Sequence, residues 1–313
     1  MAAARINPPP MKSRTGFAGV YPILYAFFDA QGRLDAGAMR RQVEACLAAG
    51  AHGIAVLGLV TEVGKLDTAE RRSIVEIVAK AIDGRVPLAV TVAEQSIAGQ
   101  REFVRMAEDN GAAWTILQPP MATGYPEAEY VRFIGAVAET ACTPVGIQNN
   151  PTNLAVSLSN ASLLALARNH ANIRLLKGEG PAVHVARLMA EGGDGYDVFC
   201  GHGGRELMTN LRSGCIGLIP APDALDVQVR ILAHYAAGTT EGRAEAERLH
   251  RSVLPIITFA LQSPALMICY GKRIFAARIG LGEVHDRAPA VAPFAFGLEE
   301  AGRLAAELPR WPG

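Results

Sequence analysis

Short apolar runs alternate with longer amphipathic segments along most of the chain. The runs are rich in aliphatic and aromatic residues and end at Gly, Pro, Asn or Asp, which is typical of buried strands. The segments between them carry apolar residues at helical spacing, and several begin at a plausible N-cap such as Asp35. The predicted strands are 19–28, 53–58, 87–93, 114–118, 144–148, 173–180, 196–201 and 215–220, and the predicted helices are 35–49, 68–82, 96–110, 127–141, 159–169, 182–191, 205–212 and 223–237.

The tandem arrangement of eight strand–helix units predicts an α/β protein with a (β/α)8 TIM barrel. A doubly wound open sheet is the alternative, but it calls for a G-x-G-x-x-G turn after the first strand, and the sequence has none there. We expect a disordered leader over 1–16, the barrel over 17–238, and a carboxy-terminal helical extension over 239–313 that packs on the barrel. Helices are predicted in the extension at 241–262, 264–280 and 299–308.

Composition narrows the class of protein. The 313 residues are 50% hydrophobic and 19% charged, and the net charge of +0 gives no reason to expect nucleic acid or an anionic membrane as a partner. The leader lacks the apolar segment of a signal peptide, and no apolar run is long enough to span a bilayer. The five cysteines are scattered, without a C-x-x-C pair or a cluster with histidine. We therefore expect a soluble, cytoplasmic protein that holds neither a metal nor a cofactor.

One lysine stands out by its position. Only five of the 30 basic residues are lysine, and four of these fall in the leader or in loop and helical segments where solvent contact is expected. Lys177 instead lies near the end of an apolar strand. A lysine that is partly removed from water loses its proton more easily and can attack a carbonyl to form an imine. The structural alternative is that Lys177 reaches solvent past the strand end, or pairs with Glu179.

Other candidate residues gather at the carboxyl ends of the predicted strands, where the loops of TIM barrels build their sites. The second strand brings 58–62, the fourth 118–121, the fifth 148–151, the seventh 201–204 and the eighth 220–222. A lysine surrounded by main-chain and side-chain amides suits a small 2-oxo acid. Its carbonyl would condense with Lys177, and its carboxylate would bind main-chain N–H groups.

At these residues the chain resembles the dihydrodipicolinate synthase/N-acetylneuraminate lyase family of Schiff-base lyases, over about residues 17 to 310. The resemblance implies a TIM barrel with a helical extension, an imine on Lys177, and a homo-oligomer that is a tetramer or a dimer. It rests on Gly58–Glu62 at the family's G-T-T-G-E loop, Asn149-x-Pro151 at its Y-N-x-P turn, Lys177, the turn Gly201-His202-Gly203-Gly204, and Gly214-x-x-Gly217.

Several departures separate the chain from the synthases of that family. Leu59 and Val60 stand where the synthases carry a hydroxyl pair, and Gln148 stands in place of their catalytic tyrosine. Asn153 replaces an arginine, and Met121 aligns near a tyrosine that is lent across a subunit contact. Because none of these side chains passes a proton as a phenol does, a tyrosine–threonine relay is not expected here.

A second branch of the family fits better, namely the 2-keto-3-deoxyarabonate dehydratases. The resemblance implies dehydration of a 2-keto-3-deoxy sugar acid: the imine at C2 acidifies the C3–H bond, a base removes that proton, and the C4 hydroxyl leaves as water. Leu59-Val60 is more apolar than a polyhydroxylated ligand calls for. The shared features are Thr61-Glu62, Gln148, Lys177-x-Glu179 and Arg287-x-Pro289.

Each remaining candidate has a structural alternative. Lys177 and Glu179 share a face of their strand, so Glu179 is either the catalytic base or acid, or a counter-ion of the lysine. Thr61 is expected to bind the substrate carboxylate, or else to cap its loop. Gln148 is expected to bond to a substrate hydroxyl or a water molecule. Glu62 is expected to be structural, accepting backbone N–H bonds within its own turn.

The glycines of the strand-end loops are expected to let the backbone approach the substrate; Gly58, Gly201 and Gly203 are the candidates. His202, between two glycines, could titrate near neutrality, but the expectation is a solvent-facing loop residue. Two other functions remain open: aldol cleavage or condensation with pyruvate, which begins from the same imine, and a non-catalytic protein that binds a keto acid without turnover.

Overall fold

Eight parallel strands form the centre of the fold. The computed structural model describes residues 13–192 and 195–312, and its sheet has the strand order β1-β8-β7-β6-β5-β4-β3-β2. Between β1 and β2 the barrel is closed by a bridge from Ile23 to Ala55 and by a hydrogen bond from the Leu24 N–H to the Ala55 carbonyl, at 2.9 Å. The predicted TIM barrel is confirmed. The strands are β1 Gly19–Val20, β2 Ile54–Val56, β3 Leu88–Val92, β4 Trp114–Leu117, β5 Val145–Asn149, β6 Ile173–Gly178, β7 Asp197–Cys200 and β8 Gly217–Leu218.

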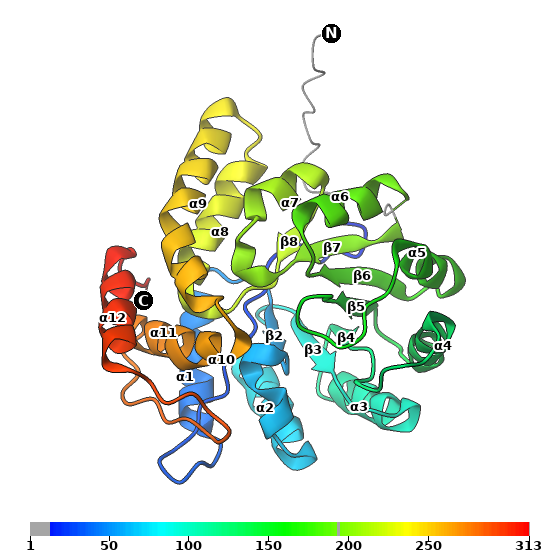
Figure 1. Ribbon diagram of the computed structural model, residues 1–313, viewed down its shortest axis with the longest axis horizontal. Coiled ribbons are helices and arrows are strands. Elements are labelled where there is room, and N and C mark those ends of the chain that lie inside the picture. The colour runs from blue at the N-terminus through cyan, green and yellow to red at the C-terminus, as the bar shows by residue number, and fades with distance from the viewer. Residues whose placement is uncertain (1–12, 193–194, 313) are drawn as a thin grey trace.

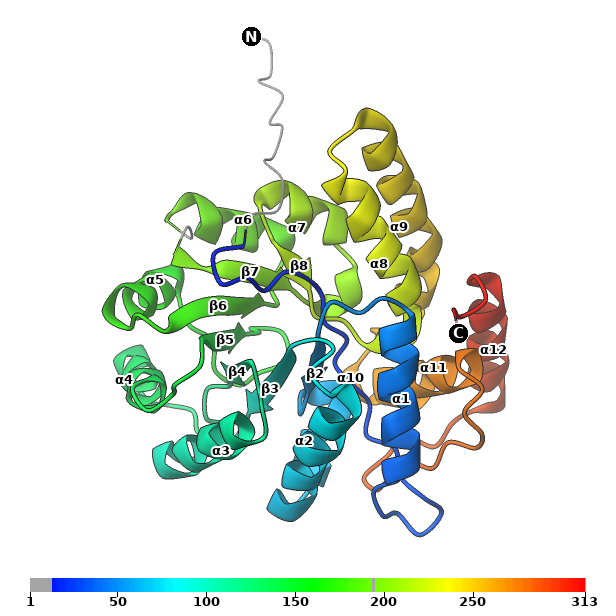
Figure 2. The ribbon, with the colours of Figure 1, turned by 180° about the vertical axis from the view of Figure 1, so that it is seen from behind.

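Helices surround the sheet on its outer side (Figures 1 and 2). Their starts follow the capping residues in the sequence: Asp35 accepts a hydrogen bond from the Ala38 N–H, and Ser96 and Ser159 cap their helices in the same way. The barrel helices are α1 Ala36–Ala48, α2 Thr68–Ile82, α3 Ile97–Asp109, α4 Glu127–Ala138, α5 Asn160–Asn169, α6 Ala182–Ala190, α7 Leu207–Ser213 and α8 Leu225–Ala236.

The first strand is much shorter than the predicted run 19–28. After Val20 the chain stays close to the sheet but pairs only at isolated bridges, one at Ile23 and one from Phe28 to both Leu34 and His285. Pro22 has no N–H to give to a ladder, which explains why regular pairing stops there.

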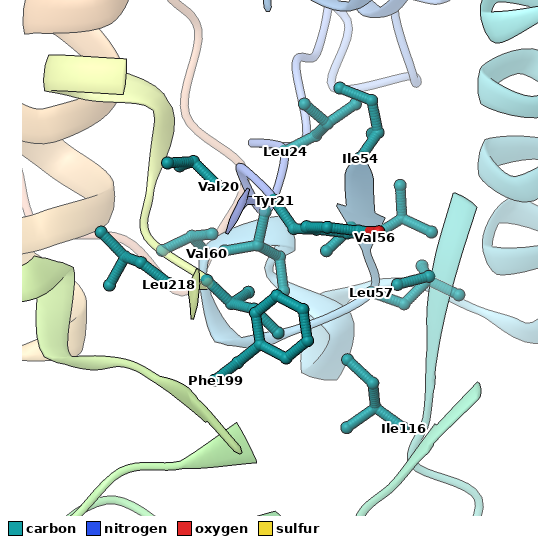
Figure 3. Close-up of a cluster of buried hydrophobic side chains, with 14 of the residues drawn as sticks. Val20, Tyr21, Leu24, Ile54, Val56, Leu57, Val60, Ile116, Phe199 and Leu218 are labelled. Carbon is teal, nitrogen blue, oxygen red and sulfur yellow. The ribbon is translucent and has the colours of Figure 1, made fainter. Parts of the chain in front are cut away.

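Three aromatic rings fill part of the barrel interior. Tyr21, Trp114 and Phe199 are at most 1% exposed, and their ring centroids lie 5.1 to 5.9 Å apart (Figure 3 shows Tyr21 and Phe199). Glycines on neighbouring strands make the room: a Cβ at Gly146 would lie 2.9 Å from the Trp114 ring, and one at Gly217 would lie 2.6 Å from the Phe199 ring. This part of the barrel is a packed core.

The carboxy-terminal extension packs against the barrel. Helix α9 (Thr240–Ala260) lies along α8, and α12 (Ala295–Glu307) packs on α11 (Lys272–Arg278), which is nearer to α1 in both views (Figures 1 and 2). The predicted helix 264–280 is divided into α10 (Pro264–Leu266), a π-helical turn η6 (Met267–Gly271) and α11. The last helix begins at Ala295, earlier than predicted. Among the described residues no single helix has the length and hydropathy to cross a membrane; α9 together with Pro264–Arg278 passes that test only as a pair bent by 105°.

Part of the leader that we expected to be disordered is anchored. The Asp197 carboxylate accepts hydrogen bonds from the Ser13 and Thr15 hydroxyls, at 2.8 and 2.6 Å, and from the N–H groups of Arg14 and Thr15. Because Asp197 begins β7, these bonds attach residues 13–15 to the amino-terminal end of the barrel. The rest of the predicted leader, 1–12, lies outside the described residues.

Candidate active site

Lys177 lies on β6 and is 4% exposed. It pairs in register with Gln148 on β5 and Phe199 on β7, so it stands in the middle of the curved sheet. Its side chain borders a cavity of about 240 Å³. The cavity is lined by Ile23, Leu59, Val60, Thr152, Asn153, Lys177, Glu179, His202, Gly203, Arg205, Ile219, Ala221, residues 261–264 and Met267. Lys177 is therefore buried beside a cavity and does not extend into bulk solvent.

The Glu179 carboxylate is the nearest charged group to this lysine. Its Oε2 atom lies 3.3 Å from the Lys177 Nζ atom, and both side chains are buried. Asn150 donates to the same oxygen at 3.0 Å, and the Gln148 amide donates a further short hydrogen bond to it. The Gln118 amide in turn donates to the Gln148 Oε1 atom at 2.7 Å. Amides from the ends of β4 and β5 thus fix the carboxylate beside the lysine.

Gln118 and Asn150 lie in the strand-end segments that the sequence marked out, but neither was predicted to help hold Glu179. Both occur at strand ends that the barrel brings together, yet nothing in the sequence shows that they converge on Glu179. Gln148 was expected to bond to a substrate hydroxyl or a water molecule, but its amide oxygen accepts from Gln118 and its amide nitrogen donates to Glu179. Gln148 is therefore positioned to orient the Glu179 carboxylate.

The glycine at position 201 makes room for Glu179. A Cβ there would lie 2.8 Å from the Glu179 Cδ atom and closer still to its Cγ, so any larger residue would displace the carboxylate. Gly203, whose φ is +60°, borders the cavity, whereas a Cβ at Gly58 would collide with the Ile23 side chain. Of the three predicted glycines, one faces the cavity and two make close packing possible.

Thr61 does not border the cavity. It is completely buried in the turn η1 (Leu59–Thr61), and its hydroxyl donates to the Leu24 carbonyl at 2.6 Å. This bond attaches the loop after β2 to the segment after β1. The neighbouring residues Leu59 and Val60 do border the cavity and give it an apolar wall.

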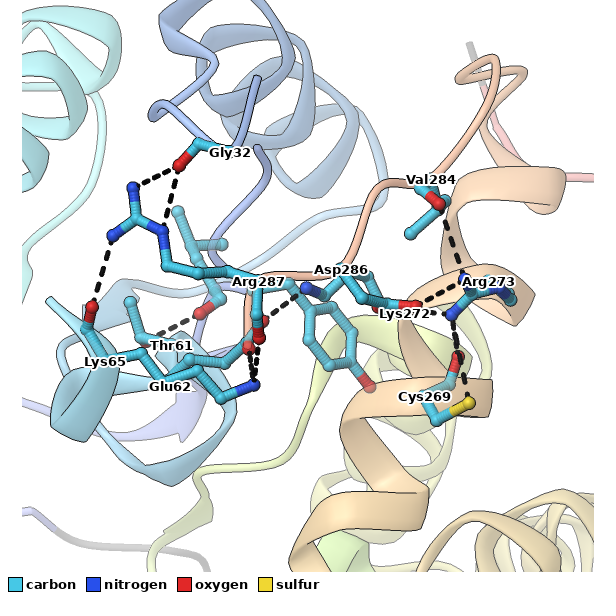
Figure 4. A network of polar contacts seen from close by, with 12 residues as sticks. Gly32, Thr61, Glu62, Lys65, Cys269, Lys272, Arg273, Val284, Asp286 and Arg287 are labelled. Atoms are coloured by element: carbon cyan, nitrogen blue, oxygen red, sulfur yellow. Dashed lines mark hydrogen bonds and ion pairs between the residues drawn. The ribbon is translucent and has the colours of Figure 1, made fainter. Parts of the chain in front are cut away.

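Glu62 is structural, as expected, but its partners are different from those predicted. Its carboxylate lies between two lysines: the Lys65 Nζ atom is 2.6 Å from Oε2, and Lys272 donates a short hydrogen bond to Oε1 (Figure 4). Lys272 is 0% exposed, so the expectation that it contacts solvent is wrong. Burial lowers the pKa of Lys272, and the Glu62 carboxylate opposes that shift.

Arg287 also serves the structure and not the cavity. Its guanidinium donates to the carbonyls of Gly32 and Lys65 and to the Glu70 carboxylate, and lies 4.1 Å from the centroid of the Phe28 ring (Figure 4). Together with Lys272, it joins the carboxy-terminal extension to the loops after β1 and β2.

The extension supplies one side of the cavity. Leu261, Gln262, Ser263, Pro264 and Met267, at the junction of α9, α10 and η6, face the loops after β1, β2 and β8. The sequence predicted that the extension packs against the barrel but not that it reaches the site. Apolar residues that line a cavity and apolar residues of a core look alike in a sequence.

His202 is half-buried and borders the cavity, so the expectation of a solvent-facing residue is wrong. Burial lowers the pKa of His202 below its usual range. Met121 and Tyr125, by contrast, are 72% and 62% exposed on the loop after β4. Within the described part of the chain, no three His, Cys, Asp or Glu side chains are arranged to hold a metal ion.

A buried lysine in contact with a fixed carboxylate, at the carboxyl end of a TIM-barrel strand, is the arrangement of a lyase that works through a Schiff base. The chain belongs to the dihydrodipicolinate synthetase family, whose model matches residues 16–291. It is accordingly an enzyme of the lyase class.

The relatives that the chain matches carry more than one activity in their names. A 4-hydroxy-tetrahydrodipicolinate synthase of Thermus thermophilus is 31% identical over 234 residues, which are 73% of this chain and 77% of that protein. The L-2-keto-3-deoxyarabonate dehydratase of Azospirillum brasilense is 25% identical over 245 residues, which are 76% and 78% of the two chains. The crystal structure of YagE from Escherichia coli K12 in complex with pyruvate has a TM-score of 0.86 at 23% identity, covering 93% of this chain and 98% of that one.

Proposed function

We propose that this enzyme removes water from a 2-keto-3-deoxy sugar acid through an imine on Lys177. The observation that carries the proposal is the Lys177–Glu179 pair, with 3.3 Å between Nζ and Oε2, at the wall of a cavity of about 240 Å³. An imine-forming lysine needs a neighbouring group that accepts and returns protons, and Glu179 is held in place for that role.

The reaction can be followed atom by atom. The neutral Nζ of Lys177 attacks the C2 carbonyl, and loss of water leaves an iminium ion that withdraws electrons from C3. The Glu179 carboxylate takes a proton from C3, the C3–C4 double bond forms, and the C4–O bond breaks. The departing hydroxyl leaves as water with the proton that Glu179 returns, and a second water molecule then hydrolyses the imine and frees Lys177.

The carboxylate of the substrate is assigned to main-chain N–H groups of the turn η1. The Thr61 hydroxyl is an unsuitable partner because it already donates to the Leu24 carbonyl. Leu59 and Val60 border the cavity, and the first N–H groups of a helical turn have no partner within it. The carboxyl group then lies near Leu59 and Val60, and the polar residues Thr152, Asn153 and Arg205 are available along the same cavity for the hydroxylated tail.

Aldol cleavage is the second candidate function, since it starts from the same iminium ion. Here Glu179 would take the proton of the C4 hydroxyl, the C3–C4 bond would break, and pyruvate would remain on Lys177. The observation in its favour is that a relative 27% identical over 246 residues is named a putative 2-dehydro-3-deoxy-D-gluconate aldolase. A synthase that depends on a tyrosine–threonine relay is disfavoured, because Gln148, Leu59 and Val60 occupy the corresponding positions.

Product analysis separates these reactions. The enzyme is incubated with 2-keto-3-deoxy sugar acids of five and six carbons, and the products are identified by mass spectrometry. Dehydration yields a 2-oxo acid that is lighter than the substrate by one water molecule and releases no pyruvate, whereas cleavage yields pyruvate and an aldehyde. A parallel incubation of pyruvate with aspartate semialdehyde tests for condensation. Absence of any product, with Lys177→Ala indistinguishable from the wild type, would favour a keto-acid-binding protein instead.

We propose in addition that the chain forms a homo-oligomer, a dimer or a tetramer, through the loop after β4. The exposed Met121 and Tyr125 side chains on this loop motivate the proposal, because large apolar side chains grouped on a surface are typical of interfaces. Light scattering of the wild type and of Met121→Glu tests it. A wild type that is monomeric at all concentrations would contradict it.

A further inference from the structure

His202 is a cavity residue for which the reaction above has no use. It lies in the turn that follows β7, and it borders the same cavity as Lys177 and Glu179. Its Nε2 atom is buried and has no hydrogen-bond partner among residues 13–192 and 195–312. No other residue along this cavity, in the part of the chain that the structure describes, has a buried side-chain nitrogen or oxygen without a partner.

The backbone holds His202 in a conformation that few side chains adopt. Its φ is +49°, in the left-handed region, which glycine adopts without strain but which residues with a side chain adopt rarely. The turn is fixed from outside: Gln228 of α8 donates to the Gly203 carbonyl at 2.8 Å, and the His250 ring of α9 lies 2.9 Å from the Gly204 carbonyl. A strained residue that its surroundings hold so firmly is characteristic of a functional position.

The surroundings of the imidazole favour its neutral form. Burial is the largest influence and lowers its pKa. The charged groups that act on the ring are Glu179 and Glu206, which oppose the shift, and Arg205 and Lys177, which add to it. A neutral imidazole donates from one nitrogen and accepts at the other, so it suits a neutral hydroxyl better than a carboxylate.

We propose that His202 binds the hydroxyl on C4 of the substrate and thereby selects 4-hydroxy-2-oxo acids. The inference rests on the proposed imine on Lys177, which fixes C2 and leaves C4 two bonds away, within the cavity that His202 also borders. A hydroxyl is both donor and acceptor, so it can bond to the imidazole in either tautomer. His202 undergoes no net change of protonation; it holds the C–O bond while Glu179 moves the proton.

The test uses competition, so that it does not depend on which reaction follows. Pyruvate has no C4, and borohydride reduction of its imine labels Lys177. A five-carbon 2-keto-3-deoxy sugar acid, which carries the C4 hydroxyl, is added as competitor, and the concentration that halves the labelling is measured. In His202→Phe, which keeps a ring but loses the hydrogen bond, this concentration is expected to rise roughly tenfold, as the loss of one hydrogen bond predicts. Labelling by pyruvate alone is expected to remain within about twofold.

Controls distinguish the possible failures. His234→Phe makes the same change on α8, at a histidine that does not border the cavity, and should behave as the wild type. His202→Asn, which tolerates the left-handed backbone and keeps a hydrogen-bonding group, should recover part of the loss. Equal competition in the wild type and His202→Phe, or a parallel loss of pyruvate labelling, overturns the role of His202. Absence of pyruvate labelling in the wild type overturns the proposed function itself.

Discussion

Replacement of Asp223 by asparagine is expected to stabilise the protein at neutral pH and not at acid pH. Asp223 follows β8, and its Oδ1 atom accepts a hydrogen bond from the Tyr25 hydroxyl at 2.6 Å. Burial raises the pKa of Asp223 from 3.8 to about 6; the Tyr25 hydrogen bond and the Arg278 guanidinium oppose that shift but do not cancel it. The folded protein therefore holds a carboxylate in surroundings that favour its neutral form.

The magnitude follows from linkage. The folded pKa exceeds the unfolded one by about 2 units, and each unit corresponds to about 1.4 kcal/mol, so ionisation of Asp223 costs the fold at most about 3 kcal/mol. A group with a raised pKa contributes its stability below the unfolded value, near pH 4, and loses it as the pH rises through about 6. Because Asp223 is only partly buried, solvent screens part of this cost, and an effect of about 1 to 3 kcal/mol is expected.

Asparagine keeps an oxygen for the Tyr25 hydroxyl but carries no charge. We expect Asp223→Asn and the wild type to have similar free energies of unfolding near pH 4, and the variant to be more stable by about 1 to 3 kcal/mol near pH 8. Urea unfolding at a fixed protein concentration across this range gives the difference directly. Tyr25→Phe is the matched control. It removes a hydrogen bond that lowers the pKa of Asp223, so the free energy of unfolding should fall more steeply with rising pH than in the wild type. A difference between Asp223→Asn and wild type that does not change with pH would refute the reasoning.

Three further substitutions test other contacts. Gly201→Ala should push the Glu179 carboxylate away from Lys177 and lower kcat by about 100-fold or more, with little change in Tm; unchanged turnover would contradict this role of Gly201. Lys272→Met leaves the buried Glu62 carboxylate with one lysine and should cost about 3 to 5 kcal/mol of unfolding free energy, part of which Glu62→Gln in the same chain should restore. Thr61→Val removes the donor to the buried Leu24 carbonyl and should cost about 1 to 3 kcal/mol while KM for the 2-oxo acid stays within about twofold; a large rise in KM would instead show that Thr61 binds substrate.

The order of the barrel elements could be predicted because each strand and helix carries its own local signal. Asp35 caps its helix, the run around Lys177 is apolar, and the predicted helix 68–82 coincides with α2. The first strand and the helix over 264–280 were predicted less well. There the outcome depends on Pro22 within the sheet and on a π-helical turn, whose position the apolar pattern does not mark.

Contacts between distant segments account for what the sequence did not reveal about the site. Lys177 and Glu179 could be paired from the alternation along one strand, and the structure brings them together. The burial of Lys272 depends on Glu62, which is 210 positions away in the chain, and nothing near Lys272 indicates such a partner. In the same way, the position of His202 depends on α8 and α9, whose side chains Gln228 and His250 hydrogen-bond to the carbonyls of Gly203 and Gly204 in its turn.

Reductive trapping tests the central claim most directly. The protein is incubated with pyruvate and borohydride, digested with trypsin, and mapped by mass spectrometry. A reduced imine on Lys177 blocks cleavage there, so the account predicts a modified peptide from Leu175 to Arg187 that carries the mass of reduced pyruvate, and none from Lys177→Arg. An unmodified protein, or an adduct on another lysine such as Lys65, would contradict it.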